Sequence, residues 1–92
     1  MTKADIVNEI AKSTGIEKSD VHKTVEAFME QVKGALAAKE NVYLRGFGSF
    51  IIKERAQKTA RNISKNTTLI IPAHNIPAFK PAKVFVAKVK GE

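Results

Sequence analysis

The sequence predicts an α+β fold: an N-terminal helix pair, a three-stranded antiparallel sheet with a long protruding β-hairpin arm, and a short C-terminal helix. Three observations lead to this prediction. Apolar residues recur at helical spacing as far as about Lys39, and the period changes to two from Val42 onwards. Residues 53–77 then alternate without a face that could seal a core. A chain of 92 residues fits one domain.

Local signals place the helices. Thr2 followed by Asp5 is a near variant of the capping box, and Gly15 is expected to end the first helix. Ser19 is a candidate cap for a second helix that extends to about Lys39. Its apolar stripe indicates a buried face, formed by Val21, Val25, Phe28, Met29, Val32 and Leu36.

The second half of the chain predicts strands. A short strand at 42–45 is followed by a tight turn at 46–48, a long strand from Ser49 to about Ala60 and a return strand over 67–79. Beyond Ile52 the chain should leave the body as a two-stranded ribbon of roughly 30 Å. We therefore divide the domain 1–92 into a helical dimerisation body with the first strand (1–46), an arm (53–77) and a C-terminal helix (81–90).

Charge is distributed unevenly along the chain. Residues 1–46 carry seven Lys and Arg and seven Asp and Glu, so the net charge of +7 lies entirely in residues 47–92. General solubility would not require this segregation. The pattern indicates a polyanion-binding face on the second half.

The predicted body is small for its apolar content. The arm contributes nothing to a core, yet the helical stripe and all five phenylalanines need burial. We therefore expect an obligate symmetric dimer with two projecting arms.

Other functional classes find little support. The chain has no cysteine, no apolar run long enough to span a membrane and no signal-peptide core, so we expect a cytoplasmic protein. Gly46-x-Gly48 lacks the third glycine and the following helix of a dinucleotide loop. His22 and His74 are too isolated for a catalytic or metal site. We expect no enzyme activity, no cofactor, no metal and no small-molecule substrate.

Three motifs together resemble the HU family of bacterial nucleoid DNA-binding proteins, which includes integration host factor. They are GFGSF at 46–50, ARNISKNTTLIIPA at 60–73 and FKPAK at 79–83. The resemblance covers essentially the whole chain. It implies an intertwined homodimer or heterodimer whose arms enter the DNA minor groove, with a tip residue that wedges between base pairs and kinks the duplex.

The arm tip departs from the family pattern, which usually reads Gly-Arg-Asn-Pro-x-Thr-Gly. Here Ala60, Ile63, Lys65 and Asn66 replace the first glycine, the proline, the threonine and the last glycine. Isoleucine is an accepted wedge, so Ile63 is the expected intercalating residue. The alternative is that Ile63 folds back across the hairpin.

The remaining site residues follow from the arm and its resemblance. We expect the arm cations to contact phosphates and the minor groove, and the amide beside them to contact the groove edge. Cations of the body are expected to bind the phosphates that flank the kink. The DNA-binding set is Lys3, Lys53, Arg55, Lys58, Arg61, Asn62, Ile63, Lys65, Lys80 and Lys83.

The leading interpretation is a nucleoid-associated protein that bends and compacts double-stranded DNA with little sequence specificity. The first alternative is a sequence-preferring bender resembling an integration host factor subunit. An RNA-binding regulator, or arms that mediate protein contacts, would be a different class.

Overall fold

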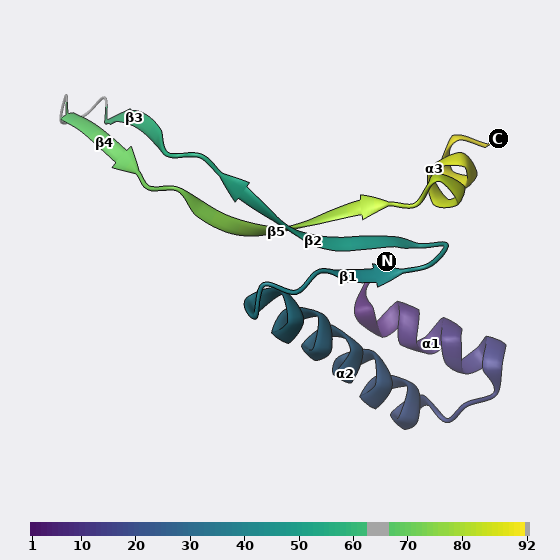
Figure 1. Ribbon diagram of the computed structural model, residues 1–92. Helices are drawn as coiled ribbons and strands as arrows, with labels where there is room; N and C mark the ends of the chain where they lie inside the picture. Colours follow the sequence, from purple (N-terminus) through teal and green to yellow (C-terminus); the bar gives the residue numbers. More distant parts are fainter. Residues whose placement is uncertain (63–66, 92) are drawn as a thin grey trace. The chain divides into compact units, whose positions relative to one another are not determined.

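The computed structural model describes residues 1–62 and 67–91, with residues 60–62, 67 and 69 described by their backbone alone. The chain forms two compact units, Met1–Gly34 and Ala35–Glu92. Two helices, five strands and a third helix follow one another in the described part of the chain (Figure 1). The predicted α+β class is confirmed.

The first unit is built by α1 (Lys3–Thr14) and by most of α2 (Lys18–Ala37). The predicted capping box is present at the start of α1. The Asp5 N–H donates to the Thr2 hydroxyl, and the Thr2 N–H donates to the Asp5 carboxylate at 2.8 Å. Gly15 ends α1 in the left-handed conformation, with φ of 76°.

The second helix differs from the prediction at both ends. It begins at Lys18, with the Glu17 carbonyl accepting the first hydrogen bonds, so Ser19 lies inside the first turn and is not the cap. It ends at Ala37, because Lys39 adopts a left-handed conformation with φ of 63°. The N–H groups of Lys39 and Glu40 then bond back into the last turn, which is the Schellman arrangement.

The second unit contains a three-stranded antiparallel sheet in the order β1 (Val42–Leu44), β2 (Gly48–Arg55) and β5 (His74–Pro81). The expected tight turn joins β1 to β2, with positive φ of 81° at Gly46. Position 48 requires a glycine, because a Cβ there would lie 2.5 Å from the ring of Phe79.

The arm continues the β2–β5 hairpin as a two-stranded sheet of β3 (Lys58–Asn62) and β4 (Thr67–Ile71). The register does not shift between the two ladders. Arg55 faces His74, and three residues further along Lys58 faces Ile71. The single long strand predicted from Ser49 to about Ala60 and the single return strand predicted over 67–79 are both wrong, because the ladder is interrupted at residues 56–57 and 72–73.

A proline accounts for the interruption. The Ile52 N–H donates to Asn41 Oδ1 at 3.1 Å and so points away from β5, which makes Ile52–Pro77 a non-hydrogen-bonded pair. Hydrogen-bonded and non-hydrogen-bonded pairs alternate, so Pro72, opposite Gln57, falls at a hydrogen-bonded position. Pro72 has no N–H to donate there, so one ladder hydrogen bond is missing, whereas Pro77 removes no ladder hydrogen bond.

Phenylalanine rings form the apolar cluster of the second unit. Phe79 lies with its ring centroid 5.0 Å from those of both Phe47 and Phe50, and Phe85 lies 5.4 Å from Phe47. Phe85 belongs to α3 (Lys83–Lys90), which begins two residues later than the predicted start at Pro81. The cluster therefore ties the sheet to α3.

Little of the described apolar surface is fully buried. Val7 and Val21, at 1% and 4% exposure, are the only buried hydrophobic side chains among the described residues. Phe28 and Phe47 remain 43% and 45% exposed. A single chain thus leaves apolar side chains that the sequence predicts to be buried exposed to solvent, as the dimer prediction requires.

Candidate nucleic-acid interface

One face of the β2–β5 hairpin carries the cations of the predicted site. Side chains alternate along a strand, so Lys53 and Arg55 lie on the face opposite Phe50. Lys80, which pairs with Ser49, lies on that same face. All three cations are exposed. The face therefore combines positive charge with a backbone fixed by two ladders.

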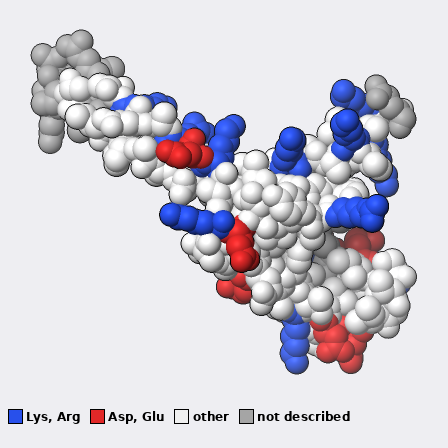
Figure 2. Space-filling model, in the orientation of Figure 1, with Lys and Arg blue, Asp and Glu red and all other residues white. Residues whose placement is uncertain are grey.

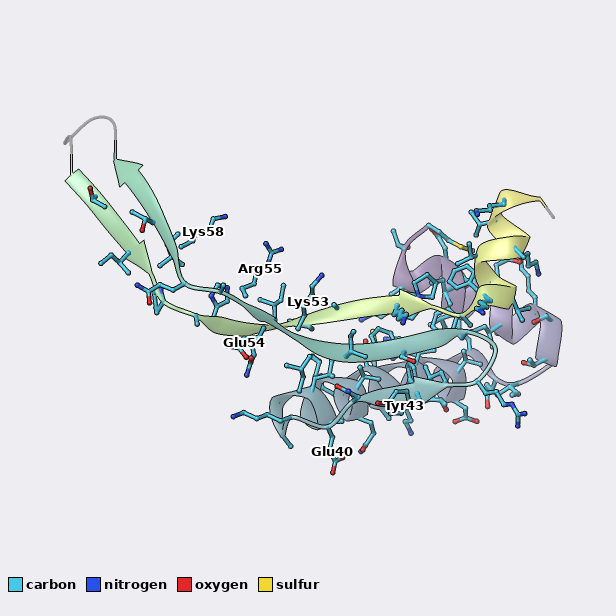
Figure 3. All side chains as sticks on the ribbon, turned by 45° about the horizontal axis from the view of Figure 1, so that its top comes forward. Glu40, Tyr43, Lys53, Glu54, Arg55 and Lys58 are labelled. Atoms are coloured by element: carbon cyan, nitrogen blue, oxygen red, sulfur yellow. The ribbon has the colours of Figure 1, made fainter. Side chains whose placement is uncertain are left out.

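The opposite face carries the acidic residue of this region. Glu54 pairs with Asn75 and is the only Asp or Glu between residues 47 and 91. Figure 3 shows Glu54 directed away from Lys53 and Arg55. The cationic face consequently has no carboxylate of its own to neutralise it among the residues of β2 and β5.

Lys58 begins β3, beyond the interruption of the ladder. Strict alternation counted from Arg55 would put Lys58 on the other face of the ribbon. In the view of Figure 3, however, Lys58 extends to the same side as Lys53 and Arg55. The break at residues 56–57 thus lets Lys58 lie on the same side as Lys53 and Arg55.

A second group of cations surrounds an open hollow of about 540 Å³ between the β1–β2 turn and the start of α3. Arg45, Lys80 and Lys83 line it together. Figure 2 shows Lys and Arg gathered over the sheet and α3. Sequence reasoning missed Arg45 because it counted this residue with the neutral first half. Its place beside the Gly46 turn was the available signal.

Lys3 is placed differently from the other predicted cations. It lies in the first unit, and its Nζ binds Oε1 of Glu26. His22 Nε2 lies 3.6 Å from the same oxygen. The hydrogen bond from Lys3 is the main cause that lowers the pKa of Glu26. Any phosphate contact of Lys3 would have to compete with this carboxylate.

The tip residues are described in part. Arg61 and Asn62 end β3, where their backbones pair with Thr68 and Thr67. Ile63 and Lys65, the predicted wedge and its neighbouring cation, lie outside the described residues. The described part of β3 thus ends at Asn62, one residue before the predicted wedge.

Other kinds of site are not assembled in the described part of the chain. No three His, Cys, Asp or Glu side chains gather there as a metal site would require. None of the described helices is long and apolar enough to span a bilayer.

A family profile described as "Bacterial DNA-binding protein" matches residues 1–90. The chain belongs to this family. The resemblance to HU proteins is thereby confirmed, and members of the family form dimers. The family is one of architectural DNA-binding proteins and not of enzymes.

Named relatives of the family match almost the whole chain. The DNA-binding protein HU of Thermus thermophilus is 41% identical over 98% of this chain and 93% of its own length. Integration host factor subunit alpha of Aliivibrio fischeri is 36% identical over 98% of this chain and 92% of its own length. A solved Anabaena HU–DNA cocrystal structure matches with a TM-score of 0.93 and 33% identity, each chain being covered completely.

Proposed function

We propose that two copies of this chain act as an architectural protein of the bacterial nucleoid, which binds duplex DNA largely without sequence specificity. One observation carries the proposal. Lys53, Arg55 and Lys80 share an exposed sheet face, and Glu54, which stands between Lys53 and Arg55 in the sequence, is turned away from it. Such a face attracts phosphates, and phosphate contacts carry no sequence information.

The arms extend this face towards the minor groove. At its base β2 pairs with both β1 and β5, so two ladders hold the hairpin there, and the arm ladder is interrupted around Pro72. A ribbon of this kind can follow a groove while its base holds the flanking phosphates. Arg61, Asn62 and Lys65 are the proposed groove contacts, and Lys83 and Lys3 are proposed phosphate contacts of the body.

A salt series tests the proposal. If Lys53, Arg55 and Lys80 of both protomers each neutralise one phosphate, log affinity should fall against log salt with a slope of about −5. Fluorescence anisotropy on linear and nicked duplexes measures this slope. Unlabelled structured RNA serves as the competitor that tests the RNA-binding alternative. A slope near zero would remove the electrostatic basis of the proposal.

A sequence-preferring bender is the second candidate function, since integration host factor subunit alpha also matches this chain. Such a protein would be one half of a heterodimer. Sedimentation of the purified chain tests self-association, and competition between random and selected DNA sites tests sequence preference. A homodimer that binds both DNA pools equally supports the architectural function.

Ile63→Ala tests the proposed wedge at the arm tip. Unstacking one base step costs a few kcal/mol, which the wider contact of a bent duplex offsets. We expect the variant to bend nicked DNA less, with a smaller loss of affinity for intact duplex. Energy transfer between dyes at the DNA ends measures the bend. Equal bending by both proteins would show that Ile63 is not the wedge.

A further inference from the structure

His74 holds a defined orientation at the start of β5. Its Nδ1 lies 3.1 Å from the carbonyl oxygen of Pro72. A carbonyl oxygen can only accept a hydrogen bond, so Nδ1 carries the hydrogen. The neutral ring therefore presents Nε2 as an unprotonated acceptor, and the side chain is exposed.

The surroundings of His74 are cationic. Arg55 is its cross-strand partner on β2, and Lys53 lies diagonally across on the same face. Glu54 points to the opposite face of β2, and the next charged residue on β5 is Lys80. No carboxylate from β2 or β5 faces the ring, so the charged side chains around it on these two strands are cations.

A DNA backbone would reverse this balance. Its phosphates supply negative charge beside Arg55 and Lys53, which favours the imidazolium. The hydrogen-bonding argument points the same way. Phosphate oxygens, adenine N3 and thymine O2 are all acceptors, which a neutral Nε2 cannot bond and a protonated Nε2–H can.

We propose that His74 is a proton-dependent DNA contact, through which affinity for duplex DNA rises as the pH falls across the histidine range. The proposal rests on the proposed function and adds one titrating contact per arm. Protonation then steepens the salt slope by about 0.9 per arm, or about 1.8 per dimer. At 0.1 M salt this corresponds to a gain in affinity of about tenfold or more.

The two histidines of the chain provide a matched test. Binding of a fluorescent duplex is measured by anisotropy at pH 5.5 and 7.5, at several salt concentrations, for the unchanged protein, His74→Gln, His22→Gln and His74→Lys. We expect the unchanged protein and His22→Gln to lose about tenfold or more in affinity on raising the pH. His74→Gln should bind the duplex weakly at both pH values, and His74→Lys should bind it tightly at both.

The outcomes separate this inference from the function on which it rests. Tight, salt-sensitive binding whose pH dependence survives in His74→Gln, or is missing from the unchanged protein, overturns the role of His74 and leaves the DNA-binding function standing. Failure of every protein to bind at any pH overturns both. Thermal melts at both pH values verify that the variants fold. An NMR titration of the His74 ring should shift to higher pH when DNA is added, and an unmoved midpoint overturns the proposal.

Discussion

Single residues of this chain adopt conformations that their own chemistry disfavours. Lys39 is the one non-glycine residue with positive φ in the described chain, at 63°. The left-handed region costs an L-residue about 1–2 kcal/mol because Cβ approaches the carbonyl oxygen. The Schellman hydrogen bonds of Lys39 and Glu40 hold it there.

Lys39→Gly should therefore stabilise the protein by about 1 kcal/mol, since glycine adopts this conformation without strain. Urea denaturation followed by circular dichroism measures the free energy of unfolding. Ala37→Gly is the matched control two residues earlier, at the last helical residue, and it should destabilise the protein because glycine loses more backbone freedom on folding. Destabilisation by both changes would contradict strain at Lys39.

The pairing of Glu26 with Lys3 predicts a pH-dependent stability. The folded state lowers the pKa of Glu26 from the ordinary value of 4.5. The ion pair therefore adds to the free energy of unfolding above pH 4.5, and this stabilisation is lost as the pH falls through the lowered pKa. Glu26→Gln should lower the melting temperature slightly at pH 7 and not in strong acid. Glu9→Gln, where no ion pair forms with the described residues, is the control. An equal deficit at both pH values would contradict the pairing.

At the scale of elements, the arm is one hairpin divided by a single missing donor. Pro72 occupies a hydrogen-bonded position and Pro77 a non-hydrogen-bonded one, although both belong to the same return path. The two prolines therefore differ in effect for a geometric reason, and not because one is intrinsically more disruptive.

Pro72→Val should restore a ladder hydrogen bond opposite Gln57 and slow amide exchange at residues 57–59. Pro77→Val is the matched control, because its new N–H would point away from β2 and add no ladder bond. Hydrogen exchange followed by NMR measures the protection of each amide. Equal protection in the two variants would contradict the assigned pairing.

The same contrast shows what the sequence could predict. Helical and two-residue periods predicted the order of elements, and alternation placed Lys53 and Arg55 on one face. Which proline interrupts the ladder depends on hydrogen-bonding parity, which the bond from Ile52 to Asn41 reveals and no local pattern encodes. Arg45 was missed because it was counted with the neutral first half, although its place beside the Gly46 turn was a signal; the fold brings it to the same hollow as Lys80.

At the scale of the whole molecule, charge and burial lead to one conclusion. The first half is neutral and the second half carries the entire charge of +7. The described chain meanwhile buries only two hydrophobic side chains and leaves Val89 75% exposed. A second copy would cover apolar surface and would double the cationic surface offered to DNA.

Folding should consequently be inseparable from dimerisation. A hundredfold increase in chain concentration then stabilises the folded dimer by about 2.7 kcal/mol. The melting temperature should rise by roughly 5–10 °C over that range, given the usual shift of about 2–4 °C per kcal/mol for a folding unit of this size. Calorimetry across the concentration series measures the shift, and sedimentation gives the mass at each end. If the melting temperature did not depend on concentration and sedimentation gave the mass of one chain, the dimer would be contradicted. A single chain with this small buried core would then be stable alone.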